Sequence, residues 1–168
     1  MDFELHRAVT LTRGAFSLLI APPEMLVEAL STHLELQRYR ILYVCGNHSH
    51  ILGRLDRQFT DLDVRRAFTA FQMMTILGEA SHTITIIEHD PTIYEDDGEI
   101  LAYMAKAMEE AARDAVVLLY APESDPYLEE ISMRANRVFY FNQDERIPRR
   151  ARKQAPADEG GQTTLGAF

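Results

Sequence analysis

Acidic side chains gather in one short stretch of the sequence, between positions 88 and 99. Converging carboxylates can bind Mg²⁺, and bound metal ions support the hydrolysis of phosphodiesters. The acids also stand around Gly98, where the dipole at the N-terminus of a following helix would stabilise them. We favour this structural interpretation and predict no metal site, although a nuclease remains an alternative. The acidic residues are Glu88, Asp90, Glu95, Asp96, Asp97 and Glu99.

A second group of potential metal ligands has the spacing Cys-x2-His-x-His and consists of Cys45, His48 and His50. Thiolate and imidazole are the ligands that zinc prefers, but this spacing matches no standard zinc module. The sequence gives no reason to place His82 or His89 beside the group. We therefore interpret these histidines as loop residues after a buried strand, and predict neither a metal nor a cofactor. A single cysteine also excludes an internal disulfide.

The last seven residues, 162–168, read Gln-Thr-Thr-Leu-Gly-Ala-Phe. A 3₁₀ turn eclipses residues three apart and would bring Leu165 and Phe168 together as a two-pronged apolar plug. Gln162 would be free to hydrogen-bond a polar pocket. A groove that receives the plug would recover about 1.5–3 kcal/mol per side chain.

This heptad resembles the PCNA-interacting peptide, Q-x-x-[LIM]-x-x-[FYW], in the form found at the C-termini of archaeal replication and repair proteins. The resemblance implies that the PCNA sliding clamp is a partner. It also implies that the clamp-binding residues are Gln162, Leu165 and Phe168.

Five basic residues lie between positions 146 and 153. A stretch rich in Pro, Asp, Glu and Gly, with few apolar side chains, separates them from the last seven residues. The composition of residues 142–161 predicts a flexible linker. Its basic half could contact DNA or the acidic surface of a clamp. A solvated linker is the simpler interpretation. The basic residues are Arg146, Arg149, Arg150, Arg152 and Lys153.

Upstream of the tail, short β-rich segments alternate with segments whose apolar residues have helical spacing. That alternation predicts a mostly parallel sheet with helices on its faces. Several of the strands are continuous apolar runs, as expected when both faces of a strand are covered. The predicted strands are residues 16–21, 40–45, 63–67, 83–88, 115–121 and 137–141. The predicted helices are residues 22–38, 48–59, 68–80, 98–114 and 125–136.

The turn after the first predicted strand lacks the chemistry of a phosphate-binding loop. Such a loop, GxxxxGK[ST], needs glycines, a lysine and a hydroxyl for Mg²⁺. Aligned without gaps, those positions hold Ala21, Leu26, Val27 and Glu28. Specific binding of ATP is therefore not expected.

Four segments nevertheless resemble the RecA/RadA recombinase-like ATPase superfamily. They are residues 14–23 (Gly-Ala-Phe-Ser-Leu-Leu-Ile-Ala-Pro-Pro), 41–47 (Ile-Leu-Tyr-Val-Cys-Gly-Asn), 66–72 (Arg-Ala-Phe-Thr-Ala-Phe-Gln) and 84–88 (Ile-Thr-Ile-Ile-Glu). The resemblance implies a RecA-like three-layer α/β sandwich, a mostly parallel central sheet with helices on both faces. It also implies work in DNA recombination, repair or replication.

The departures from the family matter as much as the matches. Glu88 stands where the family has its Mg²⁺-associated aspartate, and the lysine and hydroxyl of the phosphate loop are missing. The glutamate that activates water is also not visible near the end of the predicted strand 63–67. The chain thus resembles a pseudo-ATPase.

Length and charge set the remaining limits. The 168 residues fit one domain, residues 1–141, followed by the linker and the clamp-binding peptide. A net charge of −9 argues against broad nucleic-acid binding, so any DNA contact should be local. No apolar run is long enough to span a membrane, and we expect a cytoplasmic, nucleoid-associated protein.

The leading hypothesis is a non-enzymatic adaptor that brings recombinase or other repair proteins to the clamp. The alternatives are a clamp-tethered, metal-dependent nuclease and a competitive inhibitor of other clamp clients.

Overall fold

The computed structural model describes residues 1–55, 62–94 and 98–142. The six strands predicted from the sequence form one parallel sheet, in the order β5-β4-β6-β7-β3-β8. Their bounds are β3 (Phe16–Ile20), β4 (Ile41–Cys45), β5 (Leu62–Arg66), β6 (Ile84–Glu88), β7 (Val116–Ala121) and β8 (Arg137–Tyr140).

The four central strands, β3, β4, β6 and β7, are buried along their whole length. Their apolar runs do not alternate with polar residues because both faces of the sheet are covered. The two edge strands, β5 and β8, are mostly exposed.

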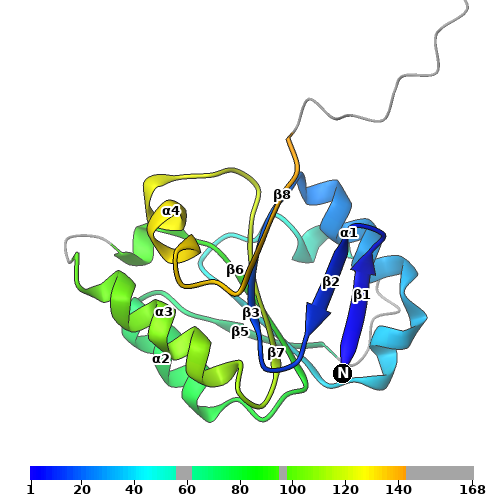
Figure 1. The fold of residues 1–168 in the computed structure, drawn as a ribbon, viewed down its shortest axis with the longest axis horizontal. Coiled ribbons are helices and arrows are strands. Elements are labelled where there is room, and N and C mark those ends of the chain that lie inside the picture. The colour runs from blue at the N-terminus through cyan, green and yellow to red at the C-terminus, as the bar shows by residue number, and fades with distance from the viewer. Residues whose placement is uncertain (56–61, 95–97, 143–168) are drawn as a thin grey trace, which may run out of the picture.

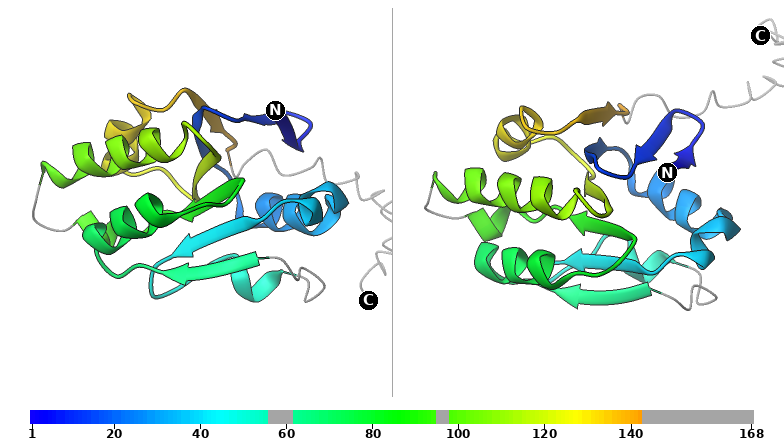
Figure 2. Two further views of the ribbon diagram at one scale, coloured as in Figure 1. Left: turned by 90° about the horizontal axis from the view of Figure 1, so that it is seen from below. Right: turned by 60° about the horizontal axis from the view of Figure 1, so that its bottom comes forward.

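Helices lie on both faces of the sheet, which confirms the predicted three-layer α/β class (Figure 1). One face carries α2 (Ala70–Glu79), α3 (Ile100–Ala111) and α4 (Pro126–Ser132), whose buried side chains form one apolar core with the sheet. The opposite face carries α1 (Pro23–Thr32), whose Leu26, Ala29 and Leu30 belong to a second core. The helices α2 and α3 lie side by side in both views of Figure 2.

An antiparallel hairpin at the N-terminus, β1 (Asp2–His6) and β2 (Val9–Thr12), was not predicted. Its alternating side chains Phe3, Leu5, Val9 and Leu11 are buried in the same core as α1. The hairpin therefore extends the layer that α1 begins.

Two helix predictions need correction. The predicted helix 22–38 ends at Thr32 and continues as a 3₁₀ helix, η1 (Leu34–Arg38). The predicted helix 48–59 is wrong over its described part, which contains only a 3₁₀ turn, η2 (Leu52–Arg54).

The other three helices fall inside their predicted ranges. Asp125 caps α4 as predicted, because its Oδ1 accepts a hydrogen bond of 2.8 Å from the Leu128 N–H. Within the described residues, no helix is long and apolar enough to cross a membrane.

Candidate functional site

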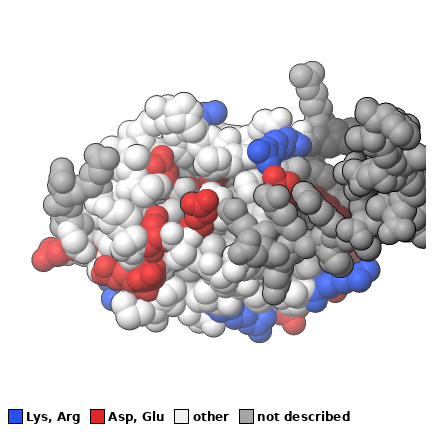
Figure 3. Space-filling model, turned by 90° about the horizontal axis from the view of Figure 1, so that it is seen from above, with Lys and Arg blue, Asp and Glu red and all other residues white. Residues whose placement is uncertain are grey.

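The carboxyl ends of the parallel strands meet at one edge of the molecule, where α/β proteins bind ligands. After β4 the chain passes over the face that α1 covers, since Ile51 joins the core of that face. After β6 it passes over the opposite face, through α3. Ligands of α/β proteins bind at such a reversal point, so a ligand is expected at the ends of β4 and β6. Figure 3 looks onto this edge and shows acidic side chains near its middle.

The turn from β3 into α1 offers few amide hydrogens to a phosphate. The Ala21 N–H donates to the Ala121 carbonyl at 3.1 Å, and the Met25 N–H donates to the Pro22 carbonyl at 3.0 Å. Pro22 and Pro23 have no amide hydrogen at all. A phosphate loop needs several amide hydrogens that point at the phosphate. In this turn two amides are hydrogen-bonded within the protein and two residues are prolines, so four positions cannot donate to a phosphate.

An acidic side chain also stands at the N-terminus of α1. Glu24 lies in the first turn, and its Oε1 is 3.1 Å from Arg54 Nη1. Glu28, which occupies the hydroxyl position of the motif in the ungapped alignment, lies further along the helix. Glu24 is the carboxylate placed to repel a phosphate at this helix end.

Glu88, at the end of β6, is held by three donors. The Tyr43 hydroxyl, the Ser49 hydroxyl and the His50 N–H each donate to its carboxylate at 2.6 Å. Only 2% of Glu88 is exposed. Burial, and after it the charge of Glu88, raises the pKa of the Tyr43 hydroxyl, so the phenol keeps its proton and remains a donor. Glu88 therefore fixes the loop after β4 instead of presenting a free carboxylate to a metal ion.

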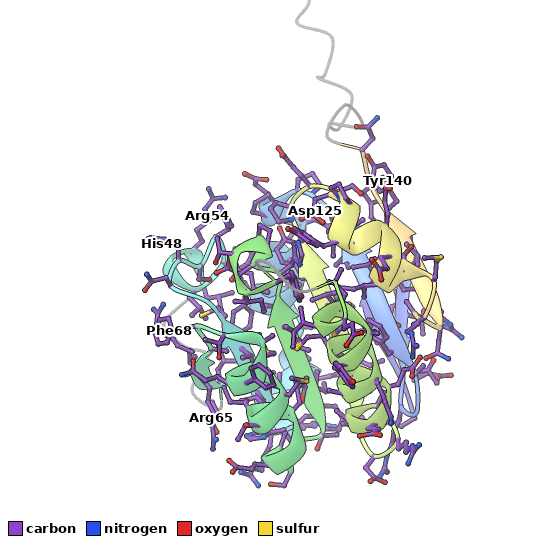
Figure 4. All side chains as sticks on the ribbon, turned by 90° about the vertical axis from the view of Figure 1, so that its left-hand side faces the viewer. His48, Arg54, Arg65, Phe68, Asp125 and Tyr140 are labelled. Atoms are coloured by element: carbon purple, nitrogen blue, oxygen red, sulfur yellow. The ribbon has the colours of Figure 1, made fainter. Side chains whose placement is uncertain are left out.

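The next residue, His89, is coupled to α4. His89 Nε2 lies 2.5 Å from Asp125 Oδ2, while the other oxygen of Asp125 caps α4. The imidazole stacks on Tyr94 with ring centroids 5.6 Å apart. Asp125 lies in the upper part of the domain in Figure 4. This carboxylate thus links the end of β6 to the start of α4.

Asp90 closes the junction between β6 and β4. Its Oδ1 accepts hydrogen bonds from the Thr92 N–H at 3.0 Å and the Thr92 hydroxyl at 2.7 Å. Its other oxygen lies against Gly46, where a Cβ atom would collide with it. Gly46 is therefore required for close packing of the two strand ends.

The potential metal ligands that the sequence analysis discounted are buried or make other contacts. Cys45 is buried, and burial is the main cause that raises the pKa of its thiol. His50 contributes its backbone N–H to Glu88, and His82 pairs with Asp63 at 3.1 Å instead of joining the other histidines. Over residues 1–55, 62–94 and 98–142, no three His, Cys, Asp or Glu side chains are placed to hold a metal ion.

Several predictions fall on residues outside those that the structure describes. They concern the acids Glu95, Asp96 and Asp97, and everything from position 143 onward. The latter includes the proposed DNA contacts Arg146, Arg149, Arg150, Arg152 and Lys153 and the clamp-binding residues Gln162, Leu165 and Phe168.

Sequence reasoning missed the two His-Asp pairs and the three donors to Glu88. The pairs join residues 19 and 36 positions apart, so no local spacing reveals them. One signal was available: polar residues followed two predicted strands, and the carboxyl ends of parallel strands meet at one edge.

Comparison with known proteins identifies an archaeal relative. A protein of Archaeoglobus fulgidus, described as an uncharacterized protein, is 30% identical over 133 residues, which cover 79% of this chain and 67% of that protein. The chain belongs to the same family. No model of a known protein family matches it.

A solved structure also resembles the chain. The structure of PCH-2 from C. elegans aligns with 79% of this chain at 16% identity, and the matched part is 36% of that protein. Its TM-score of 0.38 is too low to carry an argument about function.

Proposed function

We propose that this protein is a non-enzymatic adaptor that binds the PCNA sliding clamp through Gln162, Leu165 and Phe168. The observation that carries the proposal is the terminal heptad, with its glutamine and two apolar residues at the spacing of a clamp-binding peptide. Its partners would be repair or recombination proteins that need access to DNA at the clamp.

The globular domain would then be a RecA-like pseudo-ATPase. Three features at the carboxyl ends of the strands support this part of the proposal. The amides of the turn after β3 are used internally or replaced by prolines, and Glu24 places a carboxylate at the N-terminus of α1. Glu88, at the position of the metal-associated acid, accepts hydrogen bonds from the Tyr43 and Ser49 hydroxyls and the His50 N–H.

The domain would use the same carboxyl edge to hold its own loops. In an ATPase, hydrogen-bond donors and carboxylates at the carboxyl ends of the strands bind the nucleotide and the metal ion. Here they fix the loop after β4 and the start of α4. Such an edge suits a rigid scaffold that presents its surface to another protein.

The basic segment would add a local contact with DNA. Five cations within eight positions, 146–153, could neutralise phosphates even though the chain carries a net charge of −9. Because that interaction is electrostatic, it should weaken steeply as the salt concentration rises.

Binding to the clamp tests the proposal directly. Phe168→Ala and Leu165→Ala should each weaken binding of the full chain to immobilised clamp by about thirtyfold, because truncating an apolar anchor costs about 2 kcal/mol. Gln162→Ala should cost less. The matched control is Thr163→Ala, which changes a residue between the anchors.

The thermal unfolding temperature should stay the same in all four variants. Unchanged clamp binding by Phe168→Ala and Leu165→Ala would contradict the proposal, and so would an absence of binding by the wild-type chain. Assays of DNA cleavage with Mg²⁺ or Mn²⁺ distinguish the nuclease alternative. A competitive inhibitor would displace other clamp clients without recruiting any protein through the globular domain.

A further inference from the structure

The edge strand β5 is exposed along most of its length. Among the described residues it pairs with β4 alone. Leu62 is half-buried and the next four residues are exposed, including Val64 at 42%. Two more exposed apolar residues, Phe68 at 54% and Phe71 at 70%, follow directly after the strand. Apolar side chains beside an open strand edge favour association with another chain.

The outer backbone of β5 is placed to form hydrogen bonds. The Ala67 N–H donates to the Cys45 carbonyl of β4 at 2.9 Å. Backbone groups of successive residues in a strand point to alternate sides, so those of Val64 and Arg66 point away from β4. A strand that added to this edge would therefore meet N–H and C=O groups in the correct orientation.

The other edge of the sheet is different. At β8, the Arg137 guanidinium donates to the Thr10 carbonyl of the N-terminal hairpin at 3.1 Å. The hairpin thus lies against that edge strand, whereas β5 has no such contact among the described residues. Figure 4 shows Arg65 and Phe68 along the β5 side of the molecule and Tyr140 on the opposite side.

The charges on β5 are complementary to a second copy of themselves. Asp63 and Arg65 lie on the same face of the strand, two residues apart, with their side chains 44% and 45% exposed. Their closest atoms are 3.9 Å apart, and Arg65 is also 3.9 Å from Glu79. These separations exceed hydrogen-bond distance, so the Arg65 guanidinium keeps donors for a closer carboxylate.

We propose that β5 pairs antiparallel with β5 of a second copy of this chain, around a two-fold axis at Val64. In this register Val64 faces Val64 of the second copy, and Asp63 faces Arg65 of the second copy twice, once on each side of the axis. Leu62 lies opposite Arg66 of the second copy. A closed two-fold interface needs such a self-complementary pattern, and opposite charges directly across an antiparallel pair stabilise it.

The pairing joins two six-stranded sheets into one continuous sheet. It also gives hydrogen-bond partners to the backbone N–H and C=O groups of Val64 and Arg66 that point away from β4. The interface is small, so we expect a reversible dimer at micromolar protein concentrations. The proposal is independent of clamp binding.

A pair of complementary charge variants tests the register. Asp63→Arg gives an edge with arginine at both positions, and Arg65→Asp gives an edge with aspartate at both. Each variant alone places like charges opposite one another and should dimerise at least about tenfold more weakly than the wild type. An equimolar mixture restores both pairs and should form a heterodimer, detected by sedimentation velocity with one variant fluorescently labelled.

Two further variants keep the test decisive. Val64→Pro removes an outward N–H without removing a bond to β4, so it should give a folded monomer. This variant also serves if Asp63→Arg fails to fold after losing its 3.1 Å contact with His82. The charge control is Lys106→Glu, which should dimerise like the wild type because Lys106 lies on α3, a helix that packs against α2 and α4.

The expected wild-type mass is twice 19.2 kDa at high concentration. A wild-type chain that remains monomeric at every accessible concentration would overturn the proposal. Folded charge variants that do not associate when mixed would overturn the register, as would a Val64→Pro variant that dimerises like the wild type.

Discussion

The environment of Glu88 shows how neighbouring donors decide the role of a carboxylate. At the end of a parallel strand, a glutamate can bind a metal ion, activate water or hold a loop. Here Tyr43, Ser49 and His50 occupy its oxygens at 2.6 Å, and its exposure is 2%. These three hydrogen bonds satisfy most of the carboxylate and fix the segment after β4.

Removing one donor should measurably destabilise the fold. Tyr43→Phe leaves the ring in place but deletes the hydroxyl that donates to Glu88, so the unfolding free energy should fall by about 1.5–3 kcal/mol. Urea unfolding followed by circular dichroism measures the change. Tyr103→Phe on α3 is the control, because that side chain is 58% exposed. Equal stability of the two variants would show that Glu88 does not need the phenol.

Alkaline pH should destabilise the protein through three tyrosines. Burial is the largest cause that raises the pKa of Tyr43, Tyr94 and Tyr120 above the ordinary value near 10. Above that pH the unfolded chain loses protons that the folded chain retains. The stabilisation is therefore complete below pH ~10 and is lost as the pH rises further.

Absorbance of the phenolate form and circular dichroism, recorded together during an alkaline titration, test this coupling. The phenolate signal of the three buried rings should appear only as the native signal disappears. Complete ionisation of all seven tyrosines in a chain that still shows native circular dichroism would contradict it.

At the scale of elements, the four central strands β3, β4, β6 and β7 could be predicted because strands that are buried on both faces are continuous apolar runs in the sequence. A run such as Leu-Leu-Ile in β3, or Val-Val-Leu-Leu in β7, has few structural alternatives when turn residues follow it. The caps of α4 and α2 are also local: Asp125 and Thr69 each accept from an amide three residues later.

The elements that failed depend on contacts distant in the sequence. Residues 48–55 carry apolar side chains at helical spacing, but Ser49 and His50 donate to Glu88, about 38 positions away. This tertiary contact is incompatible with the regular helix that the local pattern favours. The N-terminal hairpin was missed because its two strands are short, five and four residues, and gain stability only from the core of α1.

The close contact between Gly46, after β4, and Asp90, after β6, can be tested by substitution. Gly46→Ala would drive a methyl group into the Asp90 carboxylate, which Thr92 holds in place, so the unfolding free energy should fall by about 1–3 kcal/mol. Combining it with Asp90→Ala should cost less than the sum of the two single changes, because the collision disappears.

Gly78→Ala in α2 is the matched control, since a Cβ there meets nothing within 4 Å. Helix propensity predicts that this control is neutral or slightly stabilising. Additive effects of the Gly46 and Asp90 changes in urea unfolding would disprove the contact.

For the whole molecule, charge limits the surfaces that can reach DNA or a DNA-bound partner. The chain carries 26 acidic and 17 basic residues, and Figure 3 shows acidic groups near the middle of the carboxyl edge. Five of the cations lie in the segment 146–153. Residues 1–142 hold the other 12 basic residues against 22 acidic ones, a balance that favours repulsion from phosphates outside the tail.

Part of the candidate site could be predicted from the sequence and part could not. The lack of phosphate-loop chemistry at the turn after β3 could be predicted because it follows from residue types alone, Ala21 and the two prolines among them. The partners of Glu88 and His89 could not, because they depend on how the strands assemble. The terminal heptad is a separate case, since its proposed partner lies outside this chain.

If the clamp contact resides in the heptad, it should be separable from the domain. The sequence predicts a flexible linker at 142–161, and about 20 flexible residues span a root-mean-square distance of roughly 25 Å. The domain can then stand clear of the clamp groove and neither help nor hinder binding. A synthetic peptide of residues 154–168 should therefore bind the clamp within about threefold of the full chain, a difference below ~1 kcal/mol.

Calorimetric titration of the clamp with the peptide and with the full chain makes this comparison. The same peptide with Phe168→Ala is the control, and it should lose binding. A full chain that binds much more tightly than the peptide would place a further contact on the domain or the basic segment. Repeating the titration at higher salt separates these two sources, because a contact through Arg and Lys weakens with salt and an apolar contact does not.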